Sequence, residues 1–151
     1  MAALIDRFIG HHNYSLDAKG RVSIPADFRE VLSERYDDKL VLMKHYDRCL
    51  VAYPVDEWNK LDAALAELAK TNPQVIKFKR MYYSSAKVCE LDAQGRVLVP
   101  PALKEYAGLG REVALVGMGE RIELWDPETY LRENAEADSA AIRDAVAAIG
   151  F

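Results

Sequence analysis

The sequence is poor in cysteine and contains no long apolar run. Its two cysteines, Cys49 and Cys89, cannot form the disulfide framework of a small secreted domain, and we expect both thiols to be buried packing residues. A membrane-spanning helix needs about 20 consecutive apolar residues, and a secretory signal needs a basic start followed by an apolar stretch. Neither pattern is present, so we expect a soluble, cytoplasmic protein without a membrane partner.

The sequence also lacks the residue patterns of common catalytic and metal sites. The glycine pairs at 108–110 and 117–119 have no third glycine in register, and the Gly-Lys-(Ser/Thr) of a phosphate-binding loop is missing. The three histidines and Cys49 do not have the spacing of zinc ligands. No nucleophile, base and acid stand together in a catalytic pattern. We therefore expect no enzymatic activity, no cofactor and no metal.

Positive charge is scarce overall but unevenly distributed. The formal net charge is −4, which argues mildly against nucleic-acid binding. Residues 1–87 nevertheless hold fourteen Lys/Arg against twelve Asp/Glu, whereas residues 88–151 hold six against twelve. The first part of the chain is thus better suited than the second to binding the phosphate backbone of a nucleic acid.

The most informative pattern present is an internal repeat. The segment 16–25 reads LDAKGRVSIP, and seventy-five positions later the segment 91–100 reads LDAQGRVLVP. Seven of the ten positions are identical, which predicts two copies of one structural unit. Arg21 and Arg96 then occupy equivalent places. Because Gln94 stands where the first copy has Lys19, we do not expect the two copies to be functionally equal.

The repeated residues predict a tight loop between two strands. Asp17 and Asp92 can accept hydrogen bonds from backbone amides further along the loop, and Gly20 and Gly95 tolerate a positive φ. The arginine that follows each glycine begins the second strand, at the edge of the turn. A proline then ends each strand and can open a short helix.

Similar strand, turn and helix patterns follow both copies, which predicts four strands and one short helix in each unit. We predict an α+β, mainly β fold in which two such units form one intramolecular pseudo-dimer, because a unit this small cannot bury a core alone. The expected divisions are a first unit over 8–55, connecting helices over 56–86, a second unit over 87–127 and a C-terminal helix over 128–151.

The doubled signature Asp-x-x-Gly-Arg-(Val/Leu)-x-(Ile/Val)-Pro resembles that of the MraZ family, over about residues 8–131. The resemblance implies tandem SpoVT/AbrB-type units folded as a swapped-hairpin barrel. It also implies a bacterial, nucleoid-associated regulator, a repressor of the division and cell-wall gene cluster, that binds double-stranded promoter DNA as a ring-like homo-oligomer, an octamer. The family's first-motif lysine and arginine correspond to Lys19 and Arg21.

The residues leave two interpretations of the motif open. In the first, Lys19 and Arg21 contact DNA, supported by Arg29 and Arg96, because a guanidinium can bind a guanine edge or a phosphate. In the second, Arg21 and Arg96 pair with the loop aspartates and only stabilise the turns. A ring-forming scaffold without DNA readout would follow from the second interpretation.

A basic and aromatic stretch at 73–86 also has two interpretations. Its lysines, arginine and tyrosines could bind nucleic acid. Alternatively, this stretch is a helix between the units that packs its rings and extends its lysine stems along them. We favour the packing interpretation.

Overall fold

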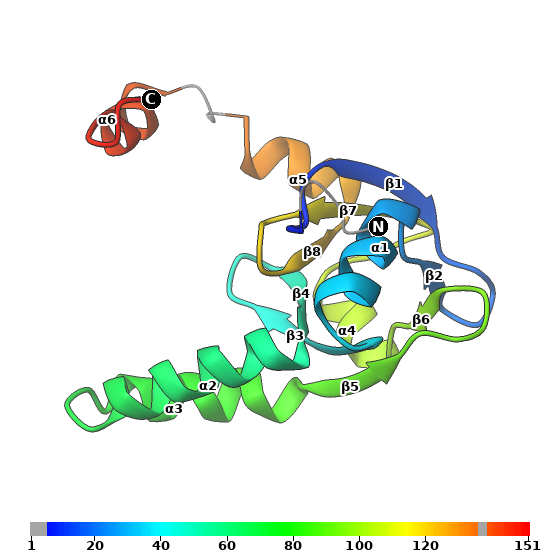
Figure 1. The fold of residues 1–151 in the computed structure, drawn as a ribbon, viewed down its shortest axis with the longest axis horizontal. Coiled ribbons are helices and arrows are strands. Elements are labelled where there is room, and N and C mark those ends of the chain that lie inside the picture. Colours follow the sequence, from blue (N-terminus) through cyan, green and yellow to red (C-terminus); the bar gives the residue numbers. More distant parts are fainter. Residues whose placement is uncertain (1–5, 136–138) are drawn as a thin grey trace.

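The chain folds as an alternation of short strands and helices in a computed structural model that describes residues 6–135 and 139–151 (Figure 1). The elements are β1 (His11–Ser15), β2 (Arg21–Ser23), α1 (Ala26–Arg35), β3 (Lys39–His45), β4 (Cys49–Pro54), α2 (Val55–Ala69), α3 (Gln74–Tyr82), the 3-10 turn η1 (Tyr83–Ser85), β5 (Lys87–Glu90), β6 (Arg96–Leu98), α4 (Pro101–Tyr106), β7 (Glu112–Gly117), β8 (Ile122–Trp125), α5 (Pro127–Glu133) and α6 (Ala140–Ala147). The predicted α+β, mainly β class is confirmed.

The two repeats exchange their first strands. The main sheet has six antiparallel strands in the order β1-β7-β8-β4-β3-β5. At one edge β1 of the first repeat pairs with β7 of the second, and at the other edge β5 of the second repeat pairs with β3 of the first. The predicted pseudo-dimer is therefore confirmed, with β4 and β8 at its centre.

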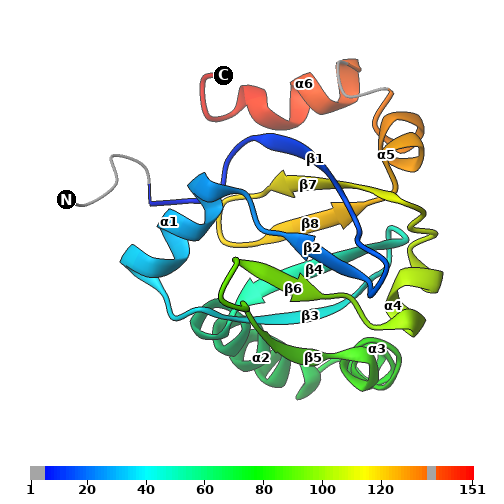
Figure 2. The ribbon, with the colours of Figure 1, turned by 90° about the vertical axis from the view of Figure 1, so that its right-hand side faces the viewer.

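The second strands of the two repeats form a separate two-stranded ribbon. β2 and β6 run antiparallel, with Val22 opposite Val97 at the midpoint. Two hydrogen bonds extend the pairing symmetrically, from Ile24 N–H to the Gly95 carbonyl and from Val99 N–H to the Gly20 carbonyl, each 2.9 Å. Figure 2 shows this ribbon crossing in front of the sheet. Closure of ribbon and sheet into a barrel remains a prediction.

The main hydrophobic core lies between the ribbon, α1 and α4 on one side and the sheet on the other. Val22 and Val97 are 0% and 4% exposed and belong to the same buried cluster as Phe28, Leu50 and Leu124. Since neighbouring residues of a strand point to opposite faces, burial of the two valines directs the residues beside them outward. The core thus decides which side chains the ribbon presents to solvent.

The helices between the units form an antiparallel hairpin that extends away from the sheet (Figure 1). A break at residues 70–73 separates α2 from α3, where the sequence has Thr-Asn-Pro. The Trp58 and Tyr83 rings lie 5.2 Å apart, and the Tyr83 hydroxyl donates a 2.8 Å hydrogen bond to Asp62. The Lys79 ammonium lies 5.0 Å above the Tyr83 ring. These contacts agree with the packing interpretation of the stretch 73–86.

The C-terminal part differs from the single helix expected over 128–151. It forms two helices, and Asp126 caps the first by accepting a 3.0 Å hydrogen bond from the Thr129 N–H. That helix ends before Asn134, and the next begins after Ser139, whose hydroxyl caps it. Asparagine and serine favour helix ends over helix interiors because their side chains bond nearby backbone groups, which explains why one helix was the wrong expectation.

Cys49 is fully buried, as expected, but Cys89 is only half-buried on the edge strand β5. Among the described residues, no helix combines the length and apolar character needed to cross a bilayer.

Candidate nucleic-acid interface

The first repeated loop is held together by one aspartate. The Asp17 Oδ1 atom accepts hydrogen bonds from the Lys19 and Arg21 amides, both 2.9 Å, and its Oδ2 atom accepts from the Arg21 Nε at 2.7 Å. The Gly20 N–H donates to the Asp17 carbonyl at 3.0 Å, and Gly20 has a φ of +83°. The side chain of Asp17 therefore determines both the course of the loop and the direction of the arginine.

The second loop repeats this arrangement. Asp92 Oδ1 accepts from the Gln94 and Arg96 amides at 2.9 and 3.0 Å, and Oδ2 accepts from the Arg96 Nε at 2.9 Å. Gly95 has a φ of +75°, close to that of its counterpart. The residues common to both copies thus produce the same loop twice.

The same bonds shift the ionisation of the two carboxylates. The backbone amide of Arg21, assisted by its guanidinium and by the Lys19 amide, lowers the pKa of Asp17 to about 2. The pKa of Asp92 is lowered in the same way, mainly by the hydrogen bond from the Arg96 backbone amide and further by the Gln94 amide and the Arg96 guanidinium. Both aspartates are therefore charged at neutral pH and hold the arginines through charge-assisted hydrogen bonds.

The ribbon places both arginines on its outer face, where their side chains are 31% and 25% exposed. Arg21 lies opposite Leu98, and Arg96 lies opposite Ser23. Because the valines between them are buried, these four side chains share the outer face of the ribbon. The repeat predicted equivalent positions for the two arginines but no common surface, and it gave no sign that Ser23 and Leu98 belong to that surface.

The ion pairs to aspartate leave the ends of the guanidinium groups unequally free. Asp17 and Asp92 engage the Nε atoms, and the Arg96 Nη1 atom also lies 3.7 Å from Asp17 Oδ2. Among the residues that the structure describes, Arg21 forms an ion pair with Asp17 alone, whereas Arg96 is paired with both Asp92 and Asp17. Arg21 is therefore oriented by one carboxylate, and Arg96 is held by two. The turn-stabilising interpretation and the DNA interpretation are compatible.

Two further cations flank the loops. Lys19 is exposed at the tip of the first loop. Arg29, from α1 of the first repeat, lies over the second loop: an added Cβ on Gly95 would stand 2.6 Å from the Arg29 Cδ. Arg29 also lines a shallow cavity with Gln94. The second loop, which has Gln94 in place of a lysine, thus receives a cation from another element.

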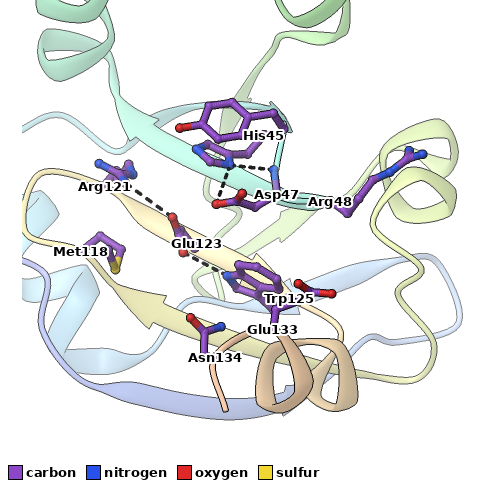
Figure 3. Close-up of a pocket in the computed structure, with 10 residues that line it drawn as sticks. His45, Asp47, Arg48, Met118, Arg121, Glu123, Trp125, Glu133 and Asn134 are labelled. Carbon is purple, nitrogen blue, oxygen red and sulfur yellow. Dashed lines mark hydrogen bonds and ion pairs between the residues drawn. The ribbon is translucent and has the colours of Figure 1, made fainter. Parts of the chain in front are cut away.

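A separate cavity of about 500 Å³ lies on the other face of the sheet, lined in part by His45, Arg121, Glu123 and Trp125 (Figure 3). Its polar groups bond one another. The Trp125 Nε1 donates to Glu123 at 3.0 Å, Arg121 lies 3.5 Å from Glu123, and His45 lies 3.6 Å from Asp47. Arg121 Nε is buried without a hydrogen-bond partner among the described residues, but the carboxylates of Glu120 and Glu123 pair with the other nitrogens of its guanidinium.

Comparison with known proteins agrees with the doubled motif. The family model described as "MraZ protein" matches residues 8–81 and again residues 82–148. A protein of Acetivibrio thermocellus named "Transcriptional regulator MraZ" is 42% identical over 146 residues, covering 94% of this chain and 99% of that relative. A protein of the same name from Desulfitobacterium hafniense is 41% identical over 133 residues, covering 88% and 90% of the two chains.

Proposed function

The chain belongs to the MraZ family, as its sequence motif predicted, and from this premise we propose that it is a DNA-binding transcriptional regulator that reads DNA with the outer face of the β2–β6 ribbon. Its relatives bear the name of a transcriptional regulator, and the chain is not an enzyme.

The observation that carries the proposal is the shared face of Arg21 and Arg96. A two-stranded ribbon fits the major groove of B-DNA, which is about 12 Å wide. An arginine whose terminal nitrogens point outward can bind guanine O6 and N7 together, the commonest specific contact to a base. Because Asp17 already fixes the Arg21 side chain, little conformational entropy is lost when that contact forms.

Lys19 and Arg29 contribute contacts to the phosphate backbone. Lys19 is exposed beside the first loop, and Arg29 lies over the second. A ribbon inserted in the groove brings both loops close to the flanking phosphates. Such contacts orient the protein on the duplex and release counterions, so affinity falls steeply as salt rises.

One ribbon covers few base pairs, so specific binding depends on several copies. The proposed unit is a ring-like homo-oligomer, an octamer, whose ribbons meet spaced repeats in the promoter of the division and cell-wall gene cluster and repress it. Linked sites gain about 10² to 10⁴ in affinity from effective concentration when their geometry matches. Affinity should therefore rise sharply with the number of DNA repeats. In the cell, the protein should colocalise with the nucleoid.

Fluorescence anisotropy with a duplex from immediately upstream of the protein's own gene tests the proposal. The expected result is binding at least tenfold tighter than to a scrambled duplex, with weaker binding when only one repeat remains. Equal affinity for the native and scrambled duplexes, at two salt concentrations, would reject specific readout. The pairing of both arginines with aspartate would then be the whole role of the motif, which is the alternative of a ring-forming scaffold.

A further inference from the structure

An exposed leucine lies beside both arginines of the ribbon. Leu98 is 53% exposed, whereas its neighbours Val97 and Val99 are 4% and 2% exposed. It is the cross-strand partner of Arg21 and stands two residues from Arg96 on the same strand face. Its side chain leans toward the first loop, with the Cδ1 atom 3.9 Å from the position of a Cβ added to Gly20.

Exposure alone would mean little, because single apolar residues are common on protein surfaces. The position of Leu98 is what distinguishes it. The internal repeat supplies its own comparison, since the equivalent residue of the first copy is the exposed Ser23. The ribbon therefore presents Arg and Ser from one strand and Arg and Leu from the other. Its two halves are matched in charge and different in polarity.

We propose that Leu98 contacts the C5 methyl group of a thymine and is a specificity-determining residue of the ribbon; this inference rests on the DNA-reading function proposed above. In the major groove only thymine among the bases displays a methyl group, and apolar side chains recognise it by contact. Cross-strand neighbours lie about 5 Å apart at Cβ, and base pairs are spaced by about 3.4 Å. The thymine thus lies one or two base steps from the base bound by Arg21.

The difference between Leu98 and Ser23 has a consequence for the DNA. A hydroxyl can donate to or accept from any base edge, so Ser23 imposes little preference. The leucine, in contrast, favours a methyl group and gains nothing from an unmethylated pyrimidine. The two halves of one ribbon should therefore prefer different base pairs, although their loops are the same.

The test removes one methyl group at a time from the DNA. Each thymine of the promoter duplex is replaced singly by 2′-deoxyuridine, which keeps base pairing and loses only the methyl. With the wild-type protein, at least one replacement should weaken binding about fourfold, equivalent to the roughly 0.8 kcal/mol of one buried methyl group. With Leu98→Ala, the same replacement should change affinity less than 1.5-fold.

Controls separate this inference from the function on which it rests. Leu131→Ala truncates another leucine that is 69% exposed, on α5, and should retain the full sensitivity to thymine replacement. If wild type prefers the promoter duplex but no single methyl matters, or if Leu98→Ala keeps the sensitivity, the thymine contact is rejected and the DNA-binding proposal stands. If wild type shows no preference for the promoter duplex, the proposed function fails, and this inference fails with it.

Discussion

The two repeated loops share one hydrogen-bond pattern and differ in their surroundings. In each, an aspartate accepts two backbone amides and the Nε of an arginine, with distances that differ by no more than 0.2 Å between the copies. The first loop has an exposed Lys19 at its tip and an arginine paired with one carboxylate. The second has Gln94 at its tip, and its glycine is covered by Arg29 from the other repeat.

This comparison separates two kinds of residue in the repeat. Most positions that are identical in both copies fix the loop and bury the ribbon, as Val22 and Val97 do. Exposed positions that differ, such as Ser23 and Leu98, make the two halves of the outer face unequal. Duplication therefore preserves the pseudo-symmetric fold, while divergence at a few exposed positions makes the two halves of one surface unequal.

The largest expected effect concerns the two arginines. Arg21→Ala should weaken binding to the promoter duplex by about 10- to 100-fold, since a bidentate contact to guanine contributes about 1–3 kcal/mol. Arg96→Ala should have a smaller effect, because Asp17 already occupies part of its guanidinium. Anisotropy titrations at one fixed salt concentration measure both.

Charge-matched variants complete that comparison. Arg21→Lys keeps the positive charge but loses the planar pair of donors, and should bind nearly as weakly as Arg21→Ala. Arg143→Ala removes one charge from exposed α6 and should bind like wild type. Equal losses for the two ribbon arginines would contradict the inequality of the loops.

The next effect concerns the stability of the loops. Gly20→Ala and Gly95→Ala should each lower the free energy of unfolding by about 1–2 kcal/mol, because a side chain disfavours the left-handed conformation. Gly95→Ala should lower it slightly further, since the new Cβ would stand 2.6 Å from Arg29 Cδ and this exposed, flexible side chain has to move aside. Urea denaturation of Gly95→Ala, alone and combined with Arg29→Ala, measures this excess.

If Arg29 covers the second loop, the double variant Gly95→Ala/Arg29→Ala should lose only the stability that the positive φ costs. The additional loss caused by the contact with Arg29 should be absent. Gly110→Ala is the matched control. Gly110 lacks the positive φ, and an added Cβ there meets no atom within 4 Å. A loss of stability in that control as large as in the loop variants would refute the backbone explanation.

A smaller effect concerns the flanking cations. Lys19→Ala and Arg29→Ala should each lower the slope of log affinity against log salt by about 0.9, the value for one phosphate contact on B-DNA. They should weaken binding to native and scrambled duplexes alike. Gln94→Lys, which makes the second loop match the first, should raise the slope by a similar amount. An unchanged slope in all three variants would exclude phosphate contacts at the loops.

Much of the fold could be predicted because the repeat is a local signal. Asp17, Gly20 and Pro25 determine a turn and a strand end through their own backbone preferences. The same residue types recur seventy-five positions later, which shows that the unit is duplicated. The common face of Arg21 and Arg96 could not be predicted in the same way. It depends on the register between β2 and β6, which is set by packing of two units seventy-five residues apart in sequence.

Two other features depended on contacts between distant segments. Arg29 reaches the second loop only because the repeats are intertwined, so its position in α1 gave no indication of its neighbour Gly95. Leu98 and Val97 are neighbouring apolar residues of one strand, and the sequence alone does not tell that only Val97 is buried. The mismatch with Ser23 in an otherwise repeated segment was the one sequence signal that could have singled it out.

The smallest expected effect is a difference between the loops in acid. The pKa of Asp17 is about 2 in the folded chain against an ordinary value of 3.8. Because the pKa of Asp17 is lower in the folded chain than in the unfolded chain, its ionised carboxylate stabilises the fold at any pH above about 4. This stabilisation is lost as the pH falls from about 4 toward 2. Asp17→Asn should therefore lose less stability than wild type between pH 5 and pH 2.5, as measured by urea denaturation.

Asp92→Asn should change the acid profile in the same direction but by less. Asp17 lies near two guanidinium groups, at 2.7 Å from Arg21 and 3.7 Å from Arg96, whereas Asp92 has an ion pair with Arg96 alone among the described residues. Asp144→Asn, in exposed α6, is the control and should follow wild type. If all three variants run parallel to wild type, the aspartates do not stabilise the loops as ionised groups, and their bonds to the arginines would then be too weak to orient them for DNA.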